Sequence, residues 1–215
     1  MSLLETATKR RFDAQFDAIR LLDPASLIAE GERYRHSIKD ARFGGFIRLG
    51  IKTYLVREVG KYEETDDKFR KKAGDIWYEL KLFCLETGEE ISIEWEEDDE
   101  LVVSLTTGFL KFSQLRDDEG GKVDEDDLDD LAEEEDSLFH QGKRFDYDDD
   151  CAAIYTRSDG RSEQVYMYDF EATDGTQLTV EEWVVDKERD KYEYQIFLAR
   201  SVDPDSIEIL STGGG

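Results

Sequence analysis

The stretch "IWYELKLFCLETGEEISIEWEEDDE", residues 76–100, has a counterpart downstream in "QVYMYDFEATDGTQLTVEEWVVDKE", residues 164–188. In both stretches apolar residues alternate with polar ones on either side of a Thr-Gly or Asp-Gly pair, with Gly88 aligned to Gly175. Such a pair is typical of a β-hairpin, because glycine adopts the positive φ that a tight turn requires. Both stretches are therefore predicted to form hairpins.

The similarity continues into the sequence on both sides of the hairpins. Upstream, "TYLVREVGKYE" (53–63) aligns with "AAIYTRSDGRSE" (153–164), and downstream an acidic turn leads to "LVVSLT" (101–106) or "YEYQIFLA" (192–199). Each copy is thus predicted to hold about four antiparallel strands. The fold class that follows is mainly β, α+β overall, with two related antiparallel β units from an internal duplication and an N-terminal helical segment. Chance similarity of two strand-rich segments is the alternative.

Duplication has a physical rationale in this interpretation. A lone four-stranded sheet has an apolar face that it cannot cover, whereas two copies can cover each other. We therefore expect the two hairpins to superpose and their units to pack about a pseudo-twofold axis. The predicted divisions of the chain are an N-terminal helical segment (1–42), a first β unit (43–115), an acidic linker (116–142), a second β unit (143–210) and a flexible Gly-rich tail (211–215).

The proposed linker is defined by its carboxylates. Leu128, Leu131 and Leu138 interrupt the acidic run and could instead form the apolar stripe of a short interdomain helix. The run does not match a calcium-binding loop, because Asp129 stands where such a loop needs glycine for its sharp turn. We expect loosely bound cations here and no dedicated metal site.

Charge is the most unusual property of the composition. The 215 residues include 28 Lys and Arg against 54 Asp and Glu, a formal net charge of −26. Self-repulsion of this size disfavours a compact state at low salt, and molar salt screens it. The composition therefore predicts a protein of a salt-in halophile, of haloarchaeal type. An acidic surface that mimics nucleic acid and binds a basic partner is the alternative, and direct binding to nucleic acid is not expected.

The N-terminal region departs from this acidity, since residues 1–57 carry 11 basic and 7 acidic side chains. A helix is predicted over residues 3–22, with an apolar stripe of Phe12, Phe16, Ile19 and Leu22. Asp23-Pro24 is expected to end it and to start a short second helix that runs through Glu30. The candidate residues for partner or membrane binding are Lys9, Arg10, Arg11, Phe12, Phe16, Ile19 and Arg20.

Two interpretations of this helix stay open. In the first, the stripe docks on protein, either within the chain or across a homodimer, because apolar side chains left in water forgo the free energy of burial. In the second, the helix binds a partner's groove or an anionic membrane surface. The chain is expected to be cytoplasmic, and the second interpretation would make it peripheral to the membrane.

Catalytic chemistry is sparse in the sequence. No cofactor-binding motif, no metal-ligand spacing and no catalytic residue is predicted. Glu94 and Glu181 occupy equivalent positions in the two copies, so an enzyme with paired carboxylates in a cleft between the β repeats is the alternative to a binding protein.

The pattern of "TYLVREV", "WYELKLF", a Thr-Gly turn and "ISIEWEEDDE" resembles an uncharacterised domain-of-unknown-function family of β-rich units that occur singly or in tandem in bacteria and archaea. The resemblance covers about residues 45–110 and, more loosely, 143–200. It implies a role near membrane-stress genes of the phage-shock type, beside which that family is often encoded. We therefore predict a non-catalytic binding or adaptor protein with a protein partner, linked to membrane-stress or envelope-associated machinery.

Overall fold

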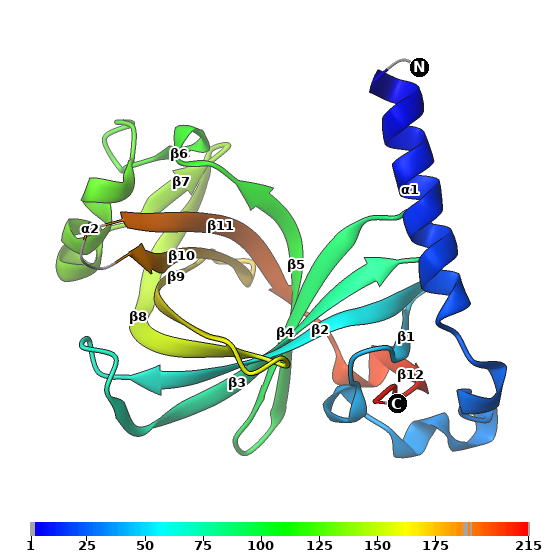
Figure 1. Cartoon of the computed structure of the whole chain (residues 1–215). Helices are drawn as coiled ribbons and strands as arrows, with labels where there is room; N and C mark the ends of the chain where they lie inside the picture. The colour runs from blue at the N-terminus through cyan, green and yellow to red at the C-terminus, as the bar shows by residue number, and fades with distance from the viewer. Residues whose placement is uncertain (1–2, 187–188, 190, 215) are drawn as a thin grey trace. The chain divides into compact units, whose positions relative to one another are not determined.

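Antiparallel β-strands make up most of the computed structural model, which describes residues 3–186, 189 and 191–214, and an α-helix precedes them (Figure 1). This confirms the predicted mainly β fold class with an N-terminal helix. The chain forms two compact units, each assembled from separate stretches of sequence. Unit 1 consists of Met1–Gly60, Tyr78–Val103 and Val202–Gly215, and unit 2 of Lys61–Trp77 and Ser104–Ser201.

Two groups of four consecutive strands carry most of the chain. The first group is β2 (Lys52–Thr65), β3 (Lys71–Cys84), β4 (Glu90–Glu97) and β5 (Leu101–Leu110). The second group is β8 (Lys143–Arg157), β9 (Ser162–Glu171), β10 (Thr176–Asp186) and β11 (Lys191–Ser201). Both groups match the strands that the two sequence copies predict. That the groups descend from one duplicated unit stays a prediction.

The compact units do not follow these two groups, because β2, β3 and β5 each pass from one unit into the other. In unit 1 the hydrogen-bonded order is β12-β1-β2-β3-β4-β5, and in unit 2 it is β5-β11-β10-β9-β8-β7-β6, with an additional pairing between β8 and β2. The remaining strands are β1 (Phe46–Leu49), β6 (Leu115–Arg116), β7 (Leu138–His140) and β12 (Ile207–Ser211).

Both predicted hairpins are present, and their turns use glycine as expected. Gly88 between β3 and β4 has φ of 68°, and Gly175 between β9 and β10 has φ of 76°. In the second hairpin, Phe170 lies opposite Leu178 and Tyr168 opposite Val180 in the antiparallel register. The alternation of apolar residues therefore places large side chains on one face of β9 and β10.

Unit 1 begins with helix α1 (Leu3–Arg20), followed by the short 3₁₀ helices η1 (Pro24–Ser26), η2 (Glu30–Arg35) and η3 (Ile38–Asp40). Asp23 caps η1 by accepting a hydrogen bond from the Ala25 N–H at 2.9 Å, as the Asp-Pro pair predicts. The second helix was expected to reach Glu30, which is wrong, because η1 ends at Ser26. A single turn of 3₁₀ helix is too short to have a buried face of its own.

The segment after η3 is held close to the end of the chain. A Cβ built on Gly45 would lie 2.6 Å from the carbonyl oxygen of Thr212, so only glycine fits at this point. Arg42 donates its backbone N–H to the same carbonyl at 2.8 Å, and Gly214 donates its own to Phe43 at 3.0 Å. Residues 211–214, predicted to form a flexible tail, thus pack on unit 1.

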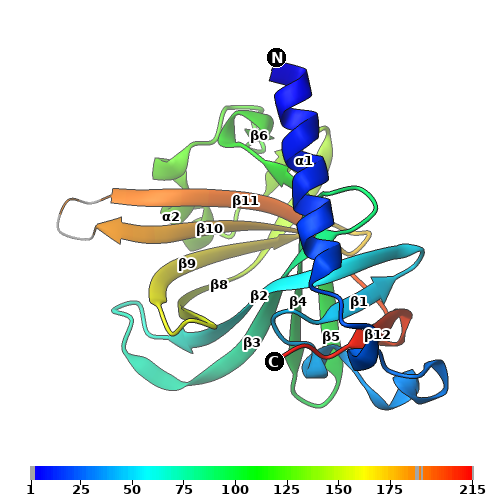
Figure 2. The same cartoon turned by 45° about the vertical axis from the view of Figure 1, so that its right-hand side comes forward.

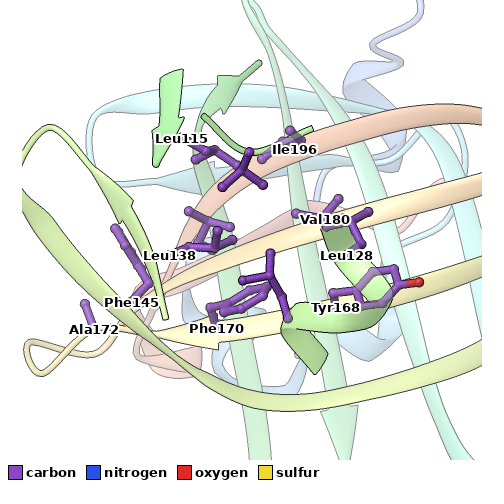
Figure 3. Packing of buried hydrophobic residues seen from close by; sticks show 12 residues of the cluster. Leu115, Leu128, Leu138, Phe145, Tyr168, Phe170, Ala172, Val180 and Ile196 are labelled. Carbon is purple, nitrogen blue, oxygen red and sulfur yellow. The ribbon is translucent and has the colours of Figure 1, made fainter. Parts of the chain in front are cut away.

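Unit 2 encloses a hydrophobic cluster, which strands β8 to β11 line together with helix α2 (Leu128–Glu134) and the short helix η4 (Phe112–Gln114) (Figures 1 and 3). The short helix η5 (Glu125–Asp127) precedes α2 and has no buried residue. Leu128 is 1% exposed and Leu138 is fully buried in this cluster, beside Phe145 and Phe170. The acidic segment 116–142, predicted to be a linker, therefore contributes leucines to the core of unit 2. Its carboxylates point outward on one side of α2 while its leucines point inward.

Candidate functional site

Helix α1 contacts the rest of unit 1 through small residues. Ala18 is 2% exposed, and Ala14 and Leu22 pack against the same cluster. The Gln15 side-chain amide donates to the backbone carbonyl of Leu85 at 2.8 Å and so fixes the helix to the loop after β3. The other members of this cluster are Phe46, Leu55, Phe83, Leu85 and Leu210. Alanine permits this close approach because it has no side chain beyond Cβ.

The large apolar residues of α1 lie on a different face. The exposed fractions of Phe12, Phe16 and Ile19 are 66%, 53% and 50%. Since successive helical residues are about 100° apart, these three form one stripe about 150° around the helix from Ala14 and Ala18. The expectation that the stripe docks within the chain is wrong for these three residues. Only Leu22, at its end, packs on unit 1.

Among the described side chains of α1, those that contact the rest of unit 1 lie between Arg11 and Ala18. Figures 1 and 2 show the N-terminal half of the helix extending beyond the strands of unit 1. Lys9 and Arg10 are exposed there, and neither forms an ion pair with any residue that the structure describes. Arg11 differs, because its Cγ would lie 2.9 Å from a Cβ on Gly88, which places it on the docked side.

Arg20 lies at the edge of the stripe. Its guanidinium carbon is 5.3 Å from the centre of the Phe16 ring, a cation–π geometry that keeps the charge beside the exposed aromatic face. Asp13 is exposed about two turns earlier. The stripe is therefore bordered by one negatively charged and one positively charged side chain. We call Phe12, Phe16 and Ile19, with Asp13 and Arg20 at their border, the α1 stripe.

A second feature is a buried carboxyl group in unit 2. Glu181 on β10 is 2% exposed, and it accepts hydrogen bonds from the Tyr62 hydroxyl and from the Trp183 indole N–H, both at 3.0 Å. The Tyr62 ring stacks on Trp77 at 5.0 Å, and Tyr155 meets Trp183 edge to face at 5.4 Å. Glu181 is thus the acceptor for the buried Tyr62 hydroxyl and the partly buried Trp183 indole N–H of this aromatic cluster.

The other carboxylate of the predicted pair lies elsewhere in the fold. Glu94 is half-buried on β4 in unit 1, next to Ile93, which is fully buried. Glu181 belongs to unit 2. A catalytic pairing of the two carboxylates stays a prediction. Among the described residues, no group of three or more His, Cys, Asp or Glu side chains is arranged to hold a metal ion.

One carboxyl group of unit 2 has a strongly shifted pKa. Burial raises the pKa of Asp169 on β9 to about 6, and the neighbouring Asp148 and Asp149 raise it further, while a hydrogen bond from the Thr179 hydroxyl opposes the shift. The pKa of an unfolded Asp is about 4. The folded state therefore binds the proton more tightly, so this group stabilises the fold at low pH and that stabilisation is lost as pH rises through 6.

Asp169→Asn is expected to raise the free energy of unfolding at pH 8 by about 1 to 3 kcal/mol, because it removes the buried charge and keeps an oxygen that accepts from Thr179. The gain over wild type should shrink as pH falls from 8 to 5, as measured by urea unfolding at constant salt. Equal stabilities of the two proteins at pH 8 would contradict the shifted pKa.

Fold and site together define the class of the protein: an antiparallel β protein whose N-terminal helix leaves an apolar stripe uncovered. The chain belongs to the family described as "Domain of unknown function (DUF4178)", whose family model matches residues 42–204. No curated protein and no solved structure matches the chain. The family match begins after α1, so the α1 stripe lies outside the matched region. In the described part of the chain, no helix combines the length and apolar character needed to cross a membrane.

Proposed function

We propose that this protein is a non-catalytic binding or adaptor protein, and that the α1 stripe is its contact surface for a protein partner. The observation that carries the proposal is the exposure of Phe12, Phe16 and Ile19 on a helix that is already anchored by another face. Burying a large apolar side chain is worth about 1.5 to 3 kcal/mol. A partner that covered all three would therefore gain a substantial part of its binding free energy from them.

A protein groove suits this helix better than a lipid surface does. Helices that lie on anionic membranes carry mainly Lys and Arg on their polar face. Here Asp13 and Asp17 alternate with the basic residues, and the chain as a whole has a net charge of −26. An anionic bilayer would repel most of this molecule. Grooves that bind amphipathic helices instead take apolar anchors at the spacing i, i+4 and i+7, which the three residues follow.

We propose two further properties. The excess of carboxylates supports a protein that works at high salt, as in a haloarchaeon, where screening removes most of the self-repulsion. The association with membrane-stress machinery rests on the family resemblance. The burial of Glu181 under aromatic rings supports a structural role for it and so favours a binding protein over the enzyme alternative.

The proposal is tested by capturing partners at molar salt with the purified tagged chain and with Phe12→Glu/Phe16→Glu. Leu21→Glu is the matched control, because Leu21 is 58% exposed directly after the helix but lies off the stripe. A protein captured by wild type and by the control, lost with the double variant and able to bind the purified chain directly supports the proposal. Recovery by the double variant of the same proteins in the same amounts would overturn it, and flotation with anionic vesicles would favour the membrane alternative.

A further inference from the structure

The residues around the α1 stripe are arranged so that the helix complements a second copy of itself. In heptad terms, Phe12, Phe16 and Ile19 occupy positions d, a and d of a coiled-coil seam. Asp13 and Arg20 then both occupy position e, on the same edge of the seam. Positions e of two helices face each other when the helices run antiparallel, so unlike charges at successive e positions make the helix self-complementary.

The opposite edge of the seam is already used. Position g is occupied by Gln15, which hydrogen-bonds to the loop after β3, and by Leu22, which packs in the unit 1 cluster. The e edge is free, since Asp13 and Arg20 are exposed and form no ion pair with any described residue. A second helix that packs on this seam can therefore form charge pairs with α1 only along the e edge.

We propose that the α1 stripe is the interface of a twofold homodimer in which two α1 helices pack antiparallel. This inference rests on the proposed function and names the partner of the same surface. In the register that it implies, Phe16 of one copy lies opposite Ile19 of the other, and Asp13 of one copy faces Arg20 of the other on both sides of the axis. Shifting the helices by one heptad would bring the two Asp13 residues together, so repulsion selects the first register.

Charge and area set the expected strength of the dimer. Residues 8–20 carry four basic and two acidic side chains, so the local net charge of α1 is positive in a highly acidic chain and a second copy meets less repulsion there than the net charge of −26 implies. Stable interfaces bury about 800 Å² per partner, and a seam of three helical turns is smaller. We therefore expect a dissociation constant of about 1 to 100 μM. A dimer would present the β units twice and would raise the avidity of an adaptor for a repeated partner.

The test is sedimentation equilibrium of the full chain from about 1 to 200 μM, at molar salt and at the lowest salt that keeps it folded. Wild type is expected to dimerise, Phe16→Glu to be monomeric and Leu21→Glu to behave as wild type. At the lower salt, Asp13→Arg and Arg20→Asp are each expected to weaken dimerisation at least fivefold, and the double reversal Asp13→Arg/Arg20→Asp to restore it. Circular dichroism confirms that each variant is folded.

Two results would overturn the dimer. Wild type that stays monomeric at 200 μM, the top of the range of about 1 to 200 μM, excludes self-association of the expected strength. Dimerisation that Phe16→Glu abolishes but the charge reversals leave unchanged excludes the antiparallel register. In the first case the stripe can still bind a different protein. Stripe-dependent capture of another protein would then contradict the dimer alone and would still support the proposed function.

Discussion

Replacing Leu128 by alanine is expected to lower the free energy of unfolding by about 2 to 5 kcal/mol, because the side chain is 1% exposed in the core of unit 2. The loss combines the transfer of the removed atoms with the cavity that they leave. Helix propensity does not contribute to it, since alanine is the best helix former. Chemical unfolding monitored by circular dichroism measures the change.

The matched control is Glu133→Ala, an exposed position on the same short helix. Removal of an exposed carboxylate from so acidic a chain should change the free energy of unfolding by no more than about 0.5 kcal/mol. If Leu128→Ala were as mild as this control, the segment 116–142 would behave as the linker that its composition predicts. A large loss instead identifies α2 as part of the unit 2 core, as the position of Leu128 in Figure 3 indicates.

Removing the Glu181 side chain is expected to cost about 2 to 5 kcal/mol of stability. Glu181→Ala leaves the Tyr62 hydroxyl and the Trp183 indole N–H without their acceptor inside the aromatic cluster of unit 2. Buried donors without a partner lose the free energy of their hydration and gain nothing in return. Thermal or urea unfolding measures the loss.

Glu181→Gln serves as the conservative comparison, because it keeps the shape and one carbonyl oxygen that can accept a hydrogen bond. It should cost clearly less than Glu181→Ala. A carboxylate kept for catalysis predicts a different result, since residues at active sites are often replaced without loss of stability or with a gain. An alanine variant as stable as wild type would therefore argue against the structural role assigned here.

The strands could be predicted from the sequence because their signals are local. Alternating apolar residues around Thr87-Gly88 and Asp174-Gly175 define the two hairpins, and the glycines take the positive φ that the turns need. The division into compact units could not be predicted. It depends on how long strands such as β2 and β3 are shared between the units, and that sharing has no signature in sequence spacing.

The face that α1 buries was the harder prediction, because the helix has two apolar faces. Burial area favours docking Phe12 and Phe16, whereas close packing favours Ala14 and Ala18, and the second effect prevails. The spacing of Ala14, Ala18 and Leu22 at i, i+4 and i+8 was the signal available in the sequence. Asp13 was also overlooked, because the charges on the helix were considered only as a basic set.

Composition misled the interpretation of the acidic segment for a similar reason. A high density of carboxylates indicates solvent exposure of most of its residues, and this is correct for the outer side of α2. Three leucines among those carboxylates are enough to bury the other side, since a two-turn helix needs only one or two anchors. The three leucines were considered as the stripe of an interdomain helix, whereas in the structure they pack within unit 2.

The central claim is that the α1 stripe serves binding and not folding, and the stability of Phe12→Glu/Phe16→Glu tests it most directly. Urea unfolding of wild type and variant is compared at molar salt and at protein concentrations of about 0.1 μM, below the expected dissociation constant of the dimer. The structure predicts free energies of unfolding that agree within about 0.5 kcal/mol per substitution, because both rings are more than half exposed. A loss of about 3 kcal/mol or more would show that the stripe is part of the core and would contradict the account.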